Sequence, residues 1–204
     1  RSKAEAQTPT FGCTSTMYLA QDAPTGLYRF NTSTNPFVVQ SVGNTSSVTY
    51  NAIAMHPTNG YIYGMRSPRT LVRIGSNGSV QDVGSIAGLP QRPLAGEFGP
   101  GGTYYLLAGN DSDTLYRVNV NTRAYTEVKL SRTISVFDLA WYDGNLYAVS
   151  SGTSYLYRIN PTTGQVTQIG PTGVNASFSI GRNSNALALL TRIFGRAIPD
   201  DDPL

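Results

Sequence analysis

The sequence contains one cysteine, Cys13, and one histidine, His56. A single cysteine excludes a disulfide within the chain and leaves only pairing with another molecule open. A zinc site needs at least three protein ligands, and a Ser-His-Asp triad needs a histidine beside its nucleophile. Both would have to use His56, but the sequence supplies no partner ligands for it and no Gly-x-Ser-x-Gly elbow. We therefore expect His56 to be a turn residue.

The chain also lacks blocks of charge and long apolar runs. Charged residues make up only 13%, and the 15 Lys and Arg residues are scattered, for a formal net charge of +3. A nucleic-acid-binding protein usually gathers its basic residues into a stripe or patch, so we expect no nucleic-acid partner. No apolar run reaches the roughly 18 residues that span a bilayer, so we expect no membrane insertion.

Secretion is expected from the start of the chain and from the style of its repeats. The first residues lack the apolar core of a signal peptide, but Ala4-Glu5-Ala6 fits the small-x-small pattern that precedes a secretory cleavage site. Secreted domains without disulfides are more typical of bacteria than of animals. The sequence thus predicts a secreted or cell-surface protein, bacterial in character.

Glycine, tyrosine and small polar residues are abundant. The 204 residues include 21 Gly and 13 Tyr, which is the balance of a β-rich protein with polar turns and not of a helical bundle. A chain of this length can bury one substantial core, so we expect a single domain.

A short phrase, LYRINPTTG in its clearest copy, recurs along the chain. Its copies occupy residues 27–34, 71–78, 115–122 and 156–164. Their central positions are 44, 44 and 41 residues apart. A fixed period of about 42 residues is typical of propellers and other repeat proteins.

Each copy belongs to a longer unit of four short strands. A Tyr-centred strand precedes the phrase, a β-branched strand follows it, and a small apolar strand leads through a turn into the next unit. The small strands are predicted at residues 51–55, 96–99, 137–141 and 178–182, and the turns at 57–60, 100–102, 142–144 and 183–185. Because Gly and Asn accept the positive φ of tight hairpins, these turns predict antiparallel neighbours.

Four antiparallel strands that repeat in this way predict an all-β propeller of four-stranded blades. Complete blades are expected at about 50–84, 94–129 and 136–170, with residues 17–43 and 177–182 joined to close a ring of four. Residues 186–190 read as a further second strand, which would compete with residues 17–20. Either the ring has a fifth, incomplete blade, or the C-terminal segment packs elsewhere. The alternative fold is a two-sheet sandwich. We place the propeller at 14–190, after an extended segment 1–13 and before a tail 191–204.

The repeat phrases, together with residues 11–21 and 137–147, resemble propeller-type repeats of bacterial secreted and cell-surface proteins of unassigned function. The resemblance covers about residues 11–190 and implies a propeller that often stands beside adhesion-type modules. It names no activity, because a fold does not determine a function.

Two carboxylates are candidates for a site in the central channel. The column just before the apolar residue of each small strand reads Ala52, Glu97, Asp138 and Ser179. Carboxylates on adjacent blades could bind an ion, Ca²⁺ being the alternative to no cofactor at all, or could serve as acid and base. The competing interpretation is structural: such carboxylates accept hydrogen bonds from nearby backbone N–H groups.

Aromatic residues near the loop ends are the preferred ligand candidates, since sugar rings and peptides pack on aromatic faces. They are Trp141, Tyr142, Tyr61, Tyr104 and Tyr155. The sequence therefore predicts a non-catalytic binding module for adhesion or surface assembly, which recognises glycan or protein. The alternatives are a propeller hydrolase or lyase that uses Glu97 and Asp138 with a metal, and a structural subunit or homo-oligomer completed by strand addition at residues 177–190.

Overall fold

The structure is a computed structural model that describes residues 8–12, 16–31, 38–91, 93–136, 138–151 and 153–172. In this part of the chain the protein is all β, with fifteen strands and no helix. None of the described segments forms a helix long and apolar enough to cross a membrane.

The strands form four antiparallel sheets that follow one another in sequence. The first sheet contains β1 (Met17–Gln21), β2 (Gly26–Asn31) and β3 (Val38–Ser41). The second contains β4 (Tyr50–Met55), β5 (Ile62–Arg66), β6 (Thr70–Ile74) and β7 (Val80–Ser85). The third contains β8 (Ala95–Phe98), β9 (Thr103–Leu107), β10 (Ser112–Asn119) and β11 (Tyr125–Ile134), and the fourth β12 (Ala140–Tyr142), β13 (Asn145–Val149), β14 (Tyr155–Ile159) and β15 (Val166–Pro171).

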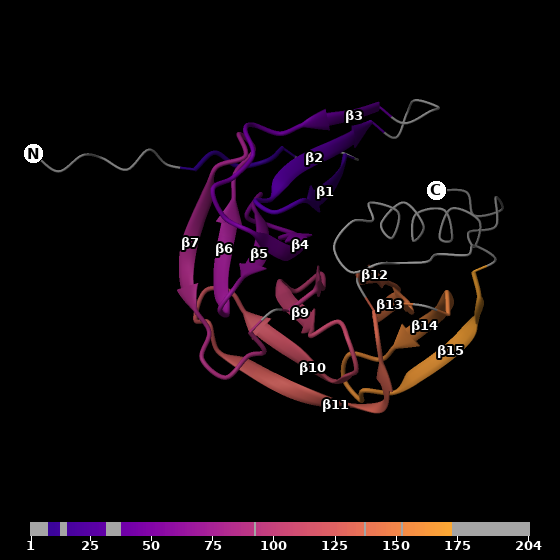
Figure 1. Cartoon of the computed structure of the whole chain (residues 1–204). Helices are drawn as coiled ribbons and strands as arrows, with labels where there is room; N and C mark the ends of the chain where they lie inside the picture. Colours follow the sequence, from indigo (N-terminus) through magenta and orange to yellow (C-terminus); the bar gives the residue numbers. More distant parts are fainter. Residues whose placement is uncertain are drawn as a thin grey trace, which may run out of the picture.

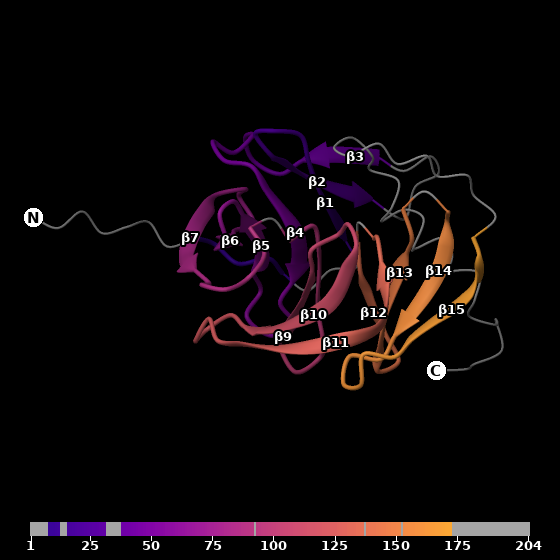
Figure 2. The same cartoon turned by 60° about the horizontal axis from the view of Figure 1, so that its bottom comes forward.

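These sheets are the four blades of a β-propeller, blades 1 to 4 in chain order. They stand around a common centre, with β4, β8 and β12 innermost and β3, β7, β11 and β15 at the rim (Figures 1 and 2). The predicted propeller, its three complete blades and the three strands of residues 17–43 are confirmed, and the two-sheet sandwich is wrong. The residues assigned to the closing strand, to a fifth blade and to the tail, like Cys13, lie outside the described residues.

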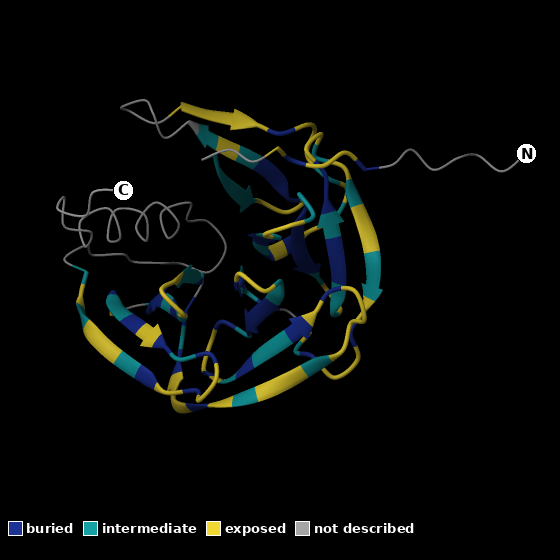
Figure 3. Ribbon diagram, turned by 180° about the vertical axis from the view of Figure 1, so that it is seen from behind, coloured by how far each residue is buried: buried dark blue, intermediate teal, exposed yellow. Residues whose placement is uncertain are grey.

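The blades are held together by three apolar layers, one between each pair of successive blades. Leu27 and Val72 belong to the layer between blades 1 and 2. Leu71 and Leu106 belong to the next, and Leu115 and Ile159 to the layer between blades 3 and 4. Exposed residues concentrate on the rim strands (Figure 3). This pattern is the reason why one blade cannot stand alone: both faces of its sheet need a neighbour.

The inner strand of blade 4 is shorter than predicted. The sequence predicts it at residues 137–141, but β12 begins at Ala140, after an isolated bridge between Val136 and Ser150. The Asp138 side chain accepts the backbone N–H of Leu139 at 2.8 Å. That amide is thereby satisfied locally, and a side chain that bonds to its own backbone competes with the strand ladder.

Candidate functional site

In each blade a tyrosine on one strand pairs with an arginine on the next. These are the second and third strands of blades 2 to 4, and β1 and β2 take the same positions in blade 1, where β3 corresponds to the fourth strand. The pairs are Tyr18 with Arg29, Tyr63 with Arg73, Tyr105 with Arg117 and Tyr147 with Arg158. The residue that pairs with the arginine on the fourth strand is Gln40, Gln81, Thr126 or Thr167, respectively. We call these four sets the Tyr-Arg rows. Because cross-strand neighbours lie on the same face of a sheet, each arginine side chain can reach its fourth-strand partner.

The arginines of blades 1 and 2 are held by their glutamine partners. Arg29 Nε donates to Gln40 Oε1 at 3.0 Å, and Arg73 Nη2 donates to Gln81 Oε1 at 2.6 Å. Arg73 Nε is buried without a partner, but the guanidinium of Arg73 also lies 4.3 Å from the ring centre of Tyr61. These two side chains are therefore fixed by the fold itself.

The arginines of blades 3 and 4 have threonine partners, whose side chains are too short to play this part. Among the described residues the Arg117 and Arg158 side chains make no hydrogen bond and no ion pair, and Arg117 Nε is buried without a partner. Arg158 is exposed, whereas Arg117 is partly buried. A buried donor with no acceptor is costly, and the other guanidinium N–H groups of Arg117 also lack an acceptor among the described residues, so those groups can serve a ligand.

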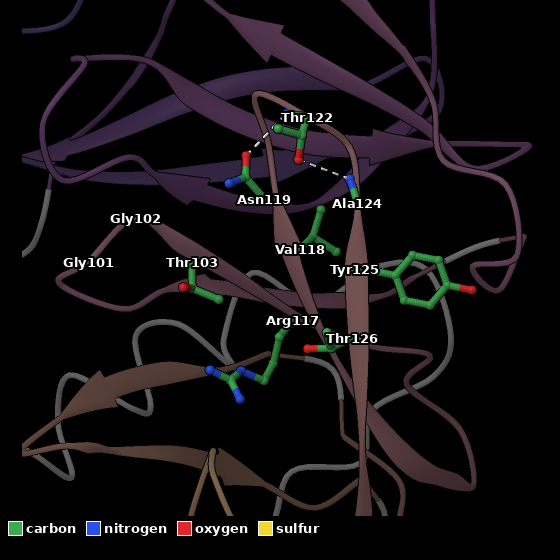
Figure 4. Close-up of a pocket in the computed structure, with 10 residues that line it drawn as sticks. All are labelled: Gly101, Gly102, Thr103, Arg117, Val118, Asn119, Thr122, Ala124, Tyr125 and Thr126. Carbon is green, nitrogen blue, oxygen red and sulfur yellow. Dashed lines mark hydrogen bonds between the residues drawn. The ribbon is translucent and has the colours of Figure 1, made fainter.

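Arg117 lines a pocket of about 340 Å³ at one end of blade 3. The pocket lies between the turn that joins β8 to β9 and the turn that joins β10 to β11 (Figure 4). Its lining consists of Gly101, Gly102, Thr103, Arg117, Val118, Asn119, Thr122, Ala124, Tyr125 and Thr126. The register pairs Arg117 with Thr126 and Asn119 with Thr103, so these polar side chains share one face of the sheet. The Tyr125 ring points away from them (Figure 4).

The turn from β10 to β11 is built by Asn119. Its Oδ1 accepts the backbone N–H groups of Asn121 and Thr122 at 2.9 and 3.0 Å. Asn160 does the same for Thr162 and Thr163 in blade 4. An asparagine that bonds to the following amides is a standard way to fix a turn, so the wall of the pocket is set by local sequence.

The five aromatic candidates differ in how far they are buried, and two of them lie in the core. Tyr104 is fully buried, stacks on Phe98 with ring centres 4.7 Å apart, and donates its hydroxyl to the Ala52 carbonyl of blade 2. Tyr61 is 8% exposed, and its hydroxyl donates to the Thr8 carbonyl at 2.8 Å. Both are core residues and present no open face to a ligand.

The other three aromatic candidates belong to blade 4. Trp141 is partly buried and stacks on Tyr105, with ring centres 5.5 Å apart and planes inclined by 24°. Tyr142 is 48% exposed beside Tyr147, while Tyr155 is partly buried against the core between blades 3 and 4. Tyr105 is the row partner of Arg117, so Trp141 stacks on the tyrosine beside Arg117 at the seam between blades 3 and 4, while neither aromatic ring lines the pocket.

The two channel carboxylates are close together but do not share a row. Strand pairing aligns Glu97 with Ala54 and Ala140, since each faces the row tyrosine of its own blade. Asp138 precedes Ala140 by two residues. The predicted column is therefore corrected: the hairpins differ in length from blade to blade, and a comparison of the phrases alone could not show this.

Burial is the main influence on both carboxyl groups. It raises the pKa of Glu97 to about 8, with a smaller contribution from the charge of Asp138, against hydrogen bonds from the Phe98 and Trp141 backbone. It raises the pKa of Asp138 to about 7, against the hydrogen bond from Leu139. Each carboxylate thus accepts the N–H of the following residue, which is 2.7 Å away for Glu97 and Phe98.

The described residues contain no candidate metal site, and the single histidine has a structural role. No group of three or more His, Cys, Asp or Glu side chains among the described residues is placed to hold a metal ion. His56 Nδ1 accepts the N–H groups of Thr58 and Asn59, each at 3.3 Å, and its ring meets Phe98 edge-on at 4.8 Å. His56 is the turn residue that the sequence predicts.

Arg117, Asn119 and Thr126 are not among the site residues that the sequence predicts. The LYR phrase shows the arginine in the sequence, but its availability depends on which residue stands opposite it in the fourth strand. That residue can be identified only when the register is known. Blades 1 and 2 have Gln40 and Gln81 at this position, whereas blades 3 and 4 have Thr126 and Thr167. This difference between the repeats is the sequence feature that could have indicated the pocket.

Comparisons with known proteins agree on the fold. A family model described as a repeat of unknown function (DUF6923) matches residues 18–183. A search of curated proteins found no match.

Three solved structures illustrate the range of similar propellers. A Bacteroides thetaiotaomicron protein of unknown function is 17% identical, with a TM-score of 0.54 over 81% of this chain and 44% of that chain. Glutaminyl cyclase from Myxococcus xanthus is 15% identical, with a TM-score of 0.53 over 88% and 70%. A chain of the nidogen/laminin complex is 12% identical, with a TM-score of 0.53 over 79% and 78%. The chain spans about half the length of the first solved structures that it matches.

Proposed function

Because the chain belongs to the repeat family of unknown function DUF6923, whose description names no reaction, we propose its role from the site. It is a non-catalytic binding module, secreted or displayed on a bacterial cell surface, that serves adhesion or surface assembly. It recognises glycan or protein through blade-end loops. The observation that carries this proposal is the polar pocket of blade 3, which is built by two hairpin turns at one end of the propeller.

The chemistry of the seam supports recognition of a polar ligand. Thr103, Asn119 and Thr126 offer hydroxyl and amide groups from one sheet face. Trp141 and the exposed Tyr142 lie on the neighbouring blade. Loops positioned by a rigid scaffold are the usual carriers of binding residues, and aromatic faces beside hydrogen-bonding groups suit sugars and peptides.

A glycan array and a panel of surface proteins, probed with the purified domain, test this proposal. We expect binding to at least one class of ligand and a loss of about tenfold or more in Trp141→Ala, because a buried aromatic contact contributes at least about 1–2 kcal/mol. Ile169→Ser serves as the matched control, since Ile169 is 53% exposed on the rim strand β15 and does not line the pocket. Absence of binding to every glycan and surface protein would defeat the proposal.

The rival function is that of a propeller hydrolase or lyase acting through Glu97 and Asp138. The observation in its favour is that burial raises the pKa of both groups to about 8 and about 7, and a carboxylic acid near neutrality is a usable proton donor. The backbone N–H groups that each carboxylate accepts support the structural role instead.

We therefore expect no turnover by the purified domain on a panel of esters, phosphates and glycosides, with or without added Ca²⁺ or Zn²⁺. Any turnover that depends on the metal and disappears in both Glu97→Gln and Asp138→Asn would establish the rival function. Turnover that survives both changes would place a catalytic site elsewhere.

A further inference from the structure

The four Tyr-Arg rows provide an internal comparison for Arg117. The fold supplies a glutamine acceptor to the arginine in blades 1 and 2, and withholds it in blades 3 and 4. In blade 3 the released arginine also lines a pocket, and its Nε is buried without a partner, as is the Nε of Arg73 in blade 2. Arg117 therefore lacks the hydrogen bond that Gln40 and Gln81 make to the arginines of blades 1 and 2, and it lies beside a pocket.

The pocket offers one positive charge and many hydrogen-bonding groups, and no carboxylate lines it. Arg117 presents a planar set of N–H donors, which matches the two oxygens of a carboxylate. Because Asn119 Oδ1 is occupied by the turn, its Nδ2 group is left to donate. The hydroxyls of Thr103 and Thr126 can both donate and accept, as sugar hydroxyls require.

We propose that this pocket binds the carboxylate-bearing ring of an acidic sugar, such as a uronic acid within a glycan, with its carboxylate on Arg117. This inference rests on the proposed function, in which a glycan is one of the two ligand classes, and it names the class of glycan. A single guanidinium balances the one negative charge of a carboxylate, whereas phosphate sites generally combine several cations or a nest of backbone N–H groups. A volume of about 340 Å³ is at the small end of ligand pockets and suits one ring.

The seam also provides a place for the sugar next to the acidic one. Tyr105 is the cross-strand partner of Arg117, and Trp141 stacks on Tyr105. The indole therefore lies one side chain away from the guanidinium, on the adjacent blade. A neighbouring ring of the same glycan can pack on the exposed part of Trp141 while the carboxylate stays on Arg117.

The test is calorimetric titration of the domain with trigalacturonate, and with neutral galactotriose as its uncharged counterpart. We expect trigalacturonate to bind about tenfold or more tightly than galactotriose, and Arg117→Gln to remove that preference, because a charge-assisted pair to a carboxylate accounts for at least this ratio. Arg158→Gln is the matched control: it removes the equivalent exposed arginine of blade 4 and should leave both affinities unchanged.

A second variant separates loss of the ligand from loss of the fold. Thr126→Gln restores in blade 3 the glutamine that holds the arginine in blades 1 and 2. We expect it to bond to Arg117, to weaken trigalacturonate binding about tenfold or more, and to leave the thermal midpoint equal to or above that of the unaltered protein.

The possible outcomes distinguish this inference from the proposed function. Equal binding of the two trisaccharides, or trigalacturonate binding unaffected by Arg117→Gln and Thr126→Gln, would overturn the inference while the binding module stands. Equally tight binding of acetate or of a peptide C-terminus through Arg117 would show a general carboxylate site and would also overturn it. If no glycan and no surface protein binds, both fail together.

Discussion

Replacing Glu97 by Gln is expected to raise the free energy of unfolding by about 2–3 kcal/mol at pH 9 and to leave it nearly unchanged at pH 5. Burial raises the pKa of Glu97 to about 8 in the folded protein, from its ordinary value of 4.5. Between these two values the folded state binds more protons than the unfolded state, so stability falls as pH rises through this window. A difference of one in pKa corresponds to about 1.4 kcal/mol, and the partial exposure of Glu97 reduces the full effect through solvent screening.

Chemical denaturation at a series of pH values measures this effect. Asp138→Asn should act in the same direction over a window that ends near pH 7, and the double variant should gain less than the sum of the two, because the Asp138 charge itself raises the pKa of Glu97. The control is Asp143→Asn, which alters an exposed carboxylate in the turn after β12. If the unaltered protein became more stable between pH 5 and 9, or if Glu97→Gln lost stability at pH 9, the account of the channel would be wrong.

Truncating Tyr104 should have the largest effect on stability in the described chain. Its ring is fully buried against Phe98, and its hydroxyl donates to the carbonyl of Ala52, which joins blade 3 to blade 2. Tyr104→Ala should cost about 3–5 kcal/mol, since it leaves a large cavity. Tyr104→Phe should cost about 1–3 kcal/mol, because the ring remains and only the buried acceptor loses its partner.

Urea denaturation compares these two variants with Tyr142→Ala. Tyr142 is 48% exposed, so its truncation should change the free energy of unfolding by less than about 1 kcal/mol. A Tyr104→Phe variant as unstable as Tyr104→Ala would show that the hydroxyl matters more than the ring. A Tyr104→Ala variant as stable as the unaltered protein would contradict the packing between blades 2 and 3.

The fold could be predicted from the sequence because each sequence repeat corresponds to one blade. The LYR phrase marks the third strand, and the Gly and Asn turns mark hairpins, so the bounds of three blades could be predicted to within a few residues. The direction of single side chains could not. Tyr61 and Tyr104 look like Tyr142 in the sequence, but strand parity turns the first two into the layers between blades.

Register was the second quantity that the sequence did not show. The sequence places Glu97 and Asp138 in one column, but the unequal hairpins of blades 3 and 4 put Ala140 opposite the row tyrosine instead of Asp138. The pocket could not be predicted for the same reason, because the strand register was unknown. Whether an arginine of the repeat is held or released depends on the residue across the sheet, and Thr126 does not stand out until it is paired with Arg117.

The most direct test of the acidic-sugar site that Arg117 lines is a map of amide chemical shifts in the ¹⁵N-labelled domain during titration with trigalacturonate. We expect the largest changes on the two turns around residues 101–103 and 119–126, on Arg117, and on Trp141 across the seam. Changes confined to Glu97 and Asp138 or to the rim strands, or no changes at all, would contradict the acidic-sugar site.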